Sequence, residues 1–202
     1  MQLIPVLAKF IFTLSLVASL VACQANSGAQ SRPGEMEFEP DADFPFGRAN
    51  PNAPPQLQQF AFMIGRNDCR EERLSNATGE WVEGYRTWDA YYFMNGNAIR
   101  DSGRSGAATN GNIRVYDAAS GQWHVTYIST PVYGTGTWSG SMVEGRIELE
   151  QPQKAPGTDI DGVNRLTFYD IQGSSFRWKG EWASLDNSIV REFWRMECEK
   201  VS

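Results

Sequence analysis

The sequence is poor in the side chains that most catalytic and metal sites require. It contains one histidine, His124, and three cysteines in 202 residues. Zinc sites need more histidine or cysteine ligands than this, and a Ser-His-Asp triad could only be built on His124. There is also no Gly-x-Ser-x-Gly motif and no glycine-rich phosphate loop leading into a helix. We therefore assign no catalytic residue and expect neither a metal nor a cofactor.

Positive charge is also scarce. The chain has 18 basic and 24 acidic residues, a formal net charge of -6. A nucleic-acid groove needs a basic face, so this balance argues against a nucleic-acid partner. Helical periodicity is missing as well, because no window of 11 residues or more carries an apolar stripe at helical spacing.

The N-terminus has the pattern of a targeting segment. The apolar run FIFTLSLVASLVA covers residues 10–22, which is too short for a membrane-spanning helix. It ends in Leu20-Val21-Ala22-Cys23, which resembles a bacterial lipobox. We expect residues 1–22 to be a lipoprotein signal peptide, and Cys23 to carry lipid such as palmitate that holds the protein on a membrane. Gln24 follows, which resembles the pattern of lipoproteins released to the outer membrane, facing the periplasm. The alternative is an ordinary signal peptide with a chance cysteine.

Removing the signal peptide and lipidating Cys23 leaves two cysteines, Cys69 and Cys198. An even pair in an oxidising compartment favours a disulfide. We expect these two residues to be bonded, the alternative being two free or buried thiols.

Composition changes near residue 57. Residues 23–57 are rich in Pro, Gly, Asn, Ser and acidic residues without a sustained period, which predicts a disordered tether. Residues 58–202 alternate short apolar runs with turn signals and predict an all-β domain. The expected strands cover residues 60–74, 81–93, 98–105, 112–118, 122–129, 136–145, 146–151, 163–171, 176–184 and 189–200.

About ten antiparallel strands joined by hairpins either stack as a sandwich or close into an up-and-down barrel. Closure would bring the first strand beside the last. Cys69 lies on the first expected strand and Cys198 on the last, so a disulfide between them would lock the seam.

Three stretches resemble a known family: FAFMIGRNDCR, IRVYDAASGQWHVTYI and RLTFYDIQGSSFRWKGEWASLDNS. They are similar to motifs of uncharacterised bacterial lipocalin-like (calycin-type) β-barrel proteins, related in shape to nitrobindin. Asn67 stands where that family usually has Trp. The resemblance implies a closed antiparallel barrel with room for a cavity, and it brings no established activity. The nitrobindin comparison would suggest haem on His124, but no matching histidine follows, so we expect His124 to be a surface or hydrogen-bonded residue.

The alternation of side chains along the expected strands predicts which residues face the interior. If the aromatic residues point inward, Arg86 accompanies Trp88 and Glu192 accompanies Trp194. We expect a small, mostly hydrophobic ligand in a pocket formed by Arg86, Trp88, Tyr92, Trp178, Trp182, Glu192 and Trp194. Two alternatives stay open: an enzyme that uses Glu192 and Arg86 as an acid/base and electrostatic pair, or a scaffold domain with a packed core and no ligand.

Overall fold

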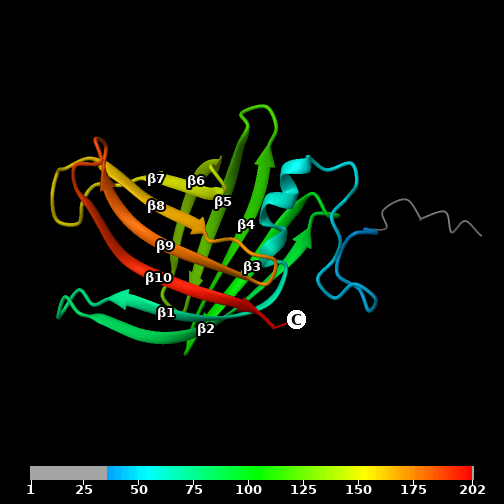
Figure 1. Ribbon diagram of the computed structural model, residues 1–202, viewed down its shortest axis with the longest axis horizontal. Helices are drawn as coiled ribbons and strands as arrows, with labels where there is room; N and C mark the ends of the chain where they lie inside the picture. The colour runs from blue at the N-terminus through cyan, green and yellow to red at the C-terminus, as the bar shows by residue number, and fades with distance from the viewer. Residues whose placement is uncertain (1–35, 202) are drawn as a thin grey trace, which may run out of the picture. The chain divides into compact units, whose positions relative to one another are not determined.

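Ten segments of alternating burial form strands in the computed structural model, which describes residues 36–201 (Figure 1). Each strand pairs with its neighbours in the chain, and β1 also pairs with β10, so that the sheet closes. The predicted closed antiparallel up-and-down barrel is therefore confirmed. The strands are β1 (Gly65–Leu74), β2 (Trp81–Phe93), β3 (Ala98–Ser105), β4 (Ala108–Asp117), β5 (Gln122–Thr130), β6 (Gly134–Val143), β7 (Arg146–Pro152), β8 (Gly162–Tyr169), β9 (Ser175–Ser184) and β10 (Val190–Lys200).

Side chains alternate between the interior and solvent along the strands, as the pleat of a strand requires. In β1, Asn67, Cys69 and Glu71 are buried, while Asp68 and Arg70 between them are exposed. The interior contains a mainly aromatic and aliphatic core that includes Trp88, Trp123, Phe168, Phe176 and Trp178. The polar residues on the same inward faces lie beside this core.

The seam between β1 and β10 carries the disulfide. Cys69 and Cys198 are directly paired in the antiparallel register, with their Cα atoms 4.1 Å apart, and they are bonded to each other. Both side chains are buried in the core. The predicted bond and its position at the meeting of the first and last strands are confirmed.

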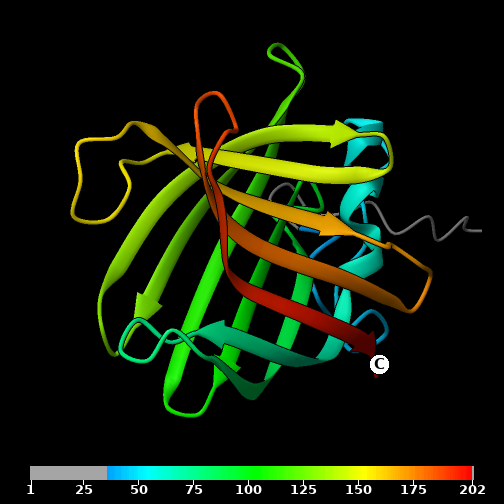
Figure 2. The same ribbon diagram turned by 60° about the vertical axis from the view of Figure 1, so that its left-hand side comes forward.

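One end of the barrel is covered by η1 (Pro55–Met63), a 3-10 helix that precedes β1. The sequence predicted a strand from residue 60, and this part of the prediction is wrong. Proline occupies the first helical turn, where its missing N–H costs nothing. Leu57, Phe60 and Met63 are buried, and the Phe60 ring lies 4.8 Å from that of Trp123. In Figure 2, η1 (cyan) crosses the right-hand end of the barrel, and the long loop between β7 and β8 (yellow) extends from the opposite end.

Residues 36–53 differ from the expected solvated tether, because they pack against the hairpin between β2 and β3. The amide of Tyr92 donates to the carbonyl of Phe46, and the amide of Asn50 donates to that of Gly96. The rings of Phe46 and Tyr91 lie 5.4 Å apart. Backbone pairing and aromatic contact therefore order a stretch whose composition alone favours disorder.

The expected signal peptide, residues 1–22, and the lipidation site, Cys23, lie outside the described residues. Within residues 36–201, no helix has the length and apolar content needed to cross a membrane.

Replacing both Cys69 and Cys198 with Ser should destabilise the barrel. The bond joins residues 129 apart. In the chain-entropy model, closing a loop of that size raises the free energy of the unfolded chain by about 4–5 kcal/mol. Urea unfolding of the oxidised protein and the double variant measures the difference. A reduced wild-type protein that unfolds at the same urea concentration as the oxidised one would contradict a structural role for the bond.

Candidate functional site

The barrel interior contains a cavity of about 220 Å³. Its wall comes from β2, β4, β5, β6, β8, β9 and β10. Phe168 forms the floor of the cavity on the side of η1, where its ring lies 5.3 Å from that of Phe60. The lining residues are Arg86, Trp88, Asn110, Asn112, Arg114, Tyr127, Trp138, Asn164, Leu166, Phe168, Trp178, Phe193, Trp194 and Met196. Several of them, such as Asn110, Asn164 and Tyr127, are only half-buried although they face inward. The cavity is therefore not sealed from solvent on every side.

Aromatic rings form much of the cavity wall. Trp178 and Trp194 meet edge to face with ring centroids 5.0 Å apart, and Tyr127 and Trp138 do so at 5.9 Å. Such pairs hold their rings in fixed orientations. The wall therefore offers rigid, flat apolar surfaces to a bound molecule.

The first polar cluster joins β1, β2 and β10. The Arg86 guanidinium forms an ion pair with Glu71 at 3.3 Å, and both side chains are almost fully buried. Glu71 also pairs with Arg73 at 3.1 Å and accepts hydrogen bonds from Ser105 Oγ and Trp194 Nε1. Arg86 Nη1 donates to the Asn110 amide oxygen at 2.8 Å. Every charge in this cluster therefore has a partner.

Small residues make room for this cluster. Gly84 lies opposite Glu71 in the register of β1 and β2, and a Cβ at Gly84 would lie 3.4 Å from the Glu71 side chain. At Gly103, a Cβ would press on the Arg86 guanidinium. A side chain at Gly103 would therefore displace the Arg86 guanidinium, whereas a Cβ at Gly84 would make ordinary van der Waals contact with Glu71.

The partners of Glu71 set its protonation. Burial by itself raises the pKa of Glu71, but the hydrogen bond from Ser105 and the charges of Arg86 and Arg73 outweigh burial and hold this pKa below its ordinary value. Burial lowers the pKa of Arg86, and Glu71 opposes that effect. An arginine remains protonated in proteins. Glu71 is therefore an ionised structural partner and a poor general acid at neutral pH.

The second polar cluster lies on β3 and β4. Asp101 forms an ion pair with Arg114 at 2.7 Å, and both side chains are buried. The other Asp101 oxygen accepts from Trp88 Nε1 at 2.8 Å and from Asn112 Nδ2 at 2.7 Å. The Arg114 guanidinium also lies 4.9 Å from the Phe60 ring centroid, which adds a cation–π contact at the floor of the cavity.

Some cavity-lining polar atoms have no hydrogen-bond partner among the residues that the structure describes. They are Trp138 Nε1, Asn164 Oδ1, Arg114 Nε and Arg86 Nε, the last of which takes part in the ion pair with Glu71. Buried polar groups are nearly always satisfied in native proteins. A polar molecule in the cavity that reached these atoms would supply the missing partners.

The predicted pocket residues divide into two groups. Arg86, Trp88, Trp178 and Trp194 line the cavity, as parity predicted. Two others lie elsewhere in the interior: Tyr92, whose pKa is raised by burial, and Trp182, whose Nε1 donates to the carbonyl of Gln153. Neither lines the cavity.

Glu192 is not part of the cavity, and its predicted inward position is wrong. The register of β9 and β10 shifts between Glu192 and Trp194, where Phe193 is the extra residue. Such a bulge reverses the alternation of side chains on either side of it. Trp194 faces inward, whereas the Glu192 side chain is 32% exposed and lies 3.8 Å from Arg195. An acid/base pair of Glu192 with Arg86 therefore does not line this cavity.

The sequence interpretation missed Glu71, Asp101 and Arg114. Glu71 shares the face of Cys69 on β1, so an expected buried cysteine was a signal for it. On β4 the hydrophobic pattern misleads, because Ile113 is 43% exposed while Arg114 is buried. Nothing local identifies Arg114, since its partner Asp101 lies on another strand.

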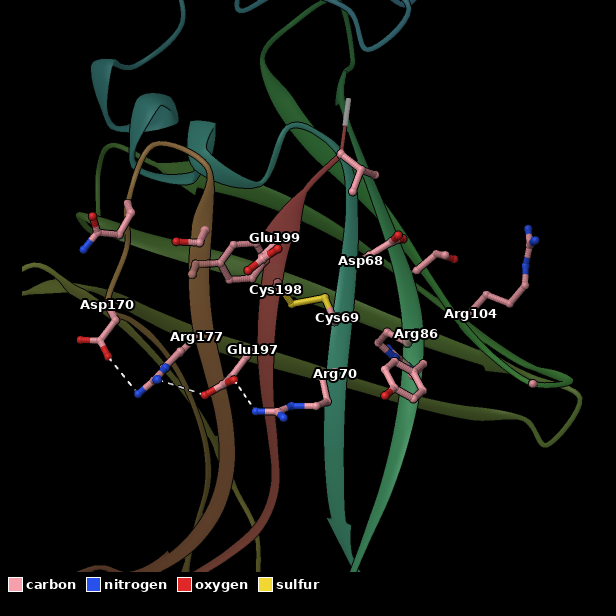
Figure 3. A pocket seen from close by; sticks show the side chains of 17 residues that line it. Asp68, Cys69, Arg70, Arg86, Arg104, Asp170, Arg177, Glu197, Cys198 and Glu199 are labelled. Carbon is pink, nitrogen blue, oxygen red and sulfur yellow. Dashed lines mark hydrogen bonds and ion pairs between the residues drawn. A yellow bond between two sulfur atoms is a disulfide. The ribbon is translucent and has the colours of Figure 1, made fainter.

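A second, larger hollow of about 1040 Å³ lies on the outside of the barrel, around the seam (Figure 3). Four of its charged residues pair with one another: Glu197 contacts Arg70 at 2.7 Å and Arg177 at 3.0 Å, and Arg177 contacts Asp170 at 3.5 Å. These side chains are about half exposed, so water already solvates them. The interior cavity, with buried charges and unpartnered polar atoms, is the stronger candidate site.

Comparison with known proteins identifies no family. No family model matches the sequence, and no curated protein matches it. Among solved structures, the S-type phycobiliprotein lyase from Guillardia theta is similar, with 11% sequence identity and a TM-score of 0.43. The similarity covers 72% of this chain and 92% of that chain. The chemistry of the cavity is therefore the basis for assigning a function.

Replacing Glu71 with Gln should cost about 3–5 kcal/mol of stability at neutral pH, because it leaves Arg86 buried without its full partner. The pKa of Glu71 is lowered from 4.5 in the folded protein. Its contribution is therefore complete above about pH 5 and is lost as pH falls through the folded pKa. Urea unfolding at neutral pH and at about pH 3 should show a difference between the two proteins that shrinks in acid.

Glu72→Gln is the matched control, because Glu72 forms its ion pair with Arg195 on the outer, more exposed side of the same strand. It should cost much less stability than Glu71→Gln. Equal losses in the two variants, or a Glu71→Gln loss that does not change with pH, would show that the buried ion pair has no special role.

Proposed function

We propose that this protein binds or carries a small, mostly hydrophobic molecule in the interior of its barrel, at the cell envelope. The cavity of about 220 Å³, with its aromatic wall and a few fixed polar groups, carries the proposal. Ligand sites in proteins have this composition. A packed scaffold, the bland alternative, would fill this space with side chains.

The open end of the barrel supports a route for an apolar ligand. The connections between β1 and β2, β3 and β4, β5 and β6, β7 and β8, and β9 and β10 share the end opposite η1, because consecutive strands are antiparallel. Exposed apolar side chains lie on three of these connections: Val132, Tyr133, Ile160, Leu185 and Ile189. They place apolar surface at the rim through which a ligand would pass.

An enzymatic role has less support. Among the described residues that line the cavity, the charged ones are both arginines, Arg86 and Arg114. Neither can exchange a proton near neutral pH. Glu71 is held ionised by its partners and does not line the cavity, so the described lining offers no carboxylate, histidine, lysine or cysteine for acid/base catalysis, and Tyr127 is its one hydroxyl group.

The cavity-filling variant Leu166→Trp tests binding. Leu166 lines the cavity, and a larger side chain there would occupy the space of a ligand. Toluene and indole, titrated into the wild-type protein by calorimetry, should bind, and the variant should bind them at least about tenfold more weakly. Leu185→Trp is the control, since Leu185 is exposed on the turn between β9 and β10. Equal binding by all three proteins, or no binding by any, would count against the proposal.

The proposed lipid anchor has a separate test. Residues 1–22 and Cys23 have the pattern of a lipoprotein signal and its modified cysteine, which would hold the barrel at an envelope membrane, we propose the outer one, facing the periplasm. Cys23→Ser should move the protein from the membrane fraction to the soluble fraction and abolish incorporation of labelled palmitate. A wild-type protein that takes up no palmitate would contradict lipidation.

A further inference from the structure

The charges that face the cavity have one sign. Among the described residues that line it, the only charged ones are Arg86 and Arg114, and no carboxylate is present. Their acidic partners, Glu71 and Asp101, do not line the cavity. A molecule in the cavity therefore meets guanidinium groups in front of their counter-ions.

Each arginine that lines the cavity is paired with a buried carboxylate that does not line it. Glu71 is shared between Arg73 and Arg86, whereas Asp101 pairs with Arg114 alone. The two clusters together contain three guanidinium groups and two carboxylates. The third guanidinium, that of Arg73, is 45% exposed and does not line the cavity. The preference for an anion therefore rests on Arg86 and Arg114, whose positive groups act in a partly desolvated interior with no carboxylate in the lining.

Three buried hydrogen-bond donors without partners belong to side chains that line the cavity. Trp138 Nε1, Arg114 Nε and Arg86 Nε donate to no acceptor among the described residues, and these three residues are 8%, 2% and 6% exposed. Asn164 Oδ1 is the one unpartnered acceptor of the lining. Donors thus outnumber acceptors, which suits a ligand with oxygen acceptors.

The size of the cavity limits the ligand. A cavity of about 150 Å³ can hold one benzene ring, and drug-sized ligands occupy about 300–1,000 Å³. The volume of about 220 Å³ suits one ring with a small substituent. The edge-to-face aromatic wall favours a flat ring over a branched aliphatic group.

We propose that the ligand is a monocyclic aromatic acid, with its ring against the tryptophans and its carboxylate against Arg114 and Trp138. This inference rests on the proposed function, because it names the class of molecule that the cavity binds. A charge-assisted hydrogen bond from a guanidinium to a carboxylate is stronger than a bond between neutral groups. The acid group, rather than the ring alone, therefore gives the cavity its selectivity.

Calorimetric titration with benzoate, benzyl alcohol, benzylammonium and toluene tests the proposal at neutral pH. Benzoate should bind at least about tenfold more tightly than benzyl alcohol, and benzylammonium should bind most weakly. If toluene and benzyl alcohol bind as tightly as benzoate, the acid preference is overturned and binding by the cavity still stands. If none of the four binds, both proposals fail.

Two variants locate the acid group. The double variant Asp101→Asn/Arg114→Met removes the cation without leaving a buried carboxylate, and the Asn oxygen can still accept from Trp88 and Asn112. It should weaken benzoate at least about tenfold and change toluene by less than about twofold. Trp138→Phe keeps a ring but loses the unpartnered N–H, and it should weaken benzoate by a smaller factor.

Trp182→Phe is the control, because Trp182 already donates to Gln153 and does not line the cavity. It should leave benzoate affinity unchanged. Thermal unfolding identifies any variant that fails to fold. If the double variant fails to fold, the benzoate affinity of Trp138→Phe decides the question. Unchanged benzoate affinity in a folded Trp138→Phe and a folded double variant would overturn the proposal.

Discussion

Strand β1 pairs with β2 on one side and with β10 on the other, and this closure makes the interior possible. Glu71 of β1 shows the consequence, since it binds Arg86 of β2 and Trp194 of β10 at once. A sheet left open between β1 and β10 would separate Glu71 from Trp194 and leave the ion pair with Arg86 at an exposed edge. The disulfide between Cys69 and Cys198 joins β1 to β10, and the hydrogen bond from Trp194 to Glu71 crosses the same seam.

Closure also determines which chemistry the interior can offer. Polar side chains on inward faces must find partners inside the barrel, because unpaired buried groups are costly. The carboxylates of Glu71 and Asp101 are held in ion pairs outside the cavity lining, while Arg86 and Arg114 also line the cavity. With η1 covering one end, the cavity is an aromatic-walled space whose charged lining residues, among those described, are both arginines. These features together favour binding of a small flat acid over catalysis.

Turn signals in the sequence predicted the ten strands, and the cysteine count predicted the disulfide. Parity along the strands predicted the inward positions of Arg86 and Trp88. These features depend on local pattern and on cysteine count. The prediction failed at Glu192, because one extra residue at Phe193 reverses the alternation and no local pattern marks that bulge. It also failed at η1, where an apolar run read as strand forms a 3-10 helix against Trp123.

The ion pair of Asp101 and Arg114 could not be read from sequence for a different reason. Its two members meet only after β3 and β4 pair, and the neighbouring Ile113 suggests the opposite face.

The most direct test of the cavity is the indole N–H signal of Trp138 in a proton–nitrogen correlation spectrum, assigned with Trp138→Phe. Added benzoate should shift this signal and leave that of Trp182 in place. A Trp138 signal that does not move under saturating benzoate would contradict an acid-binding cavity.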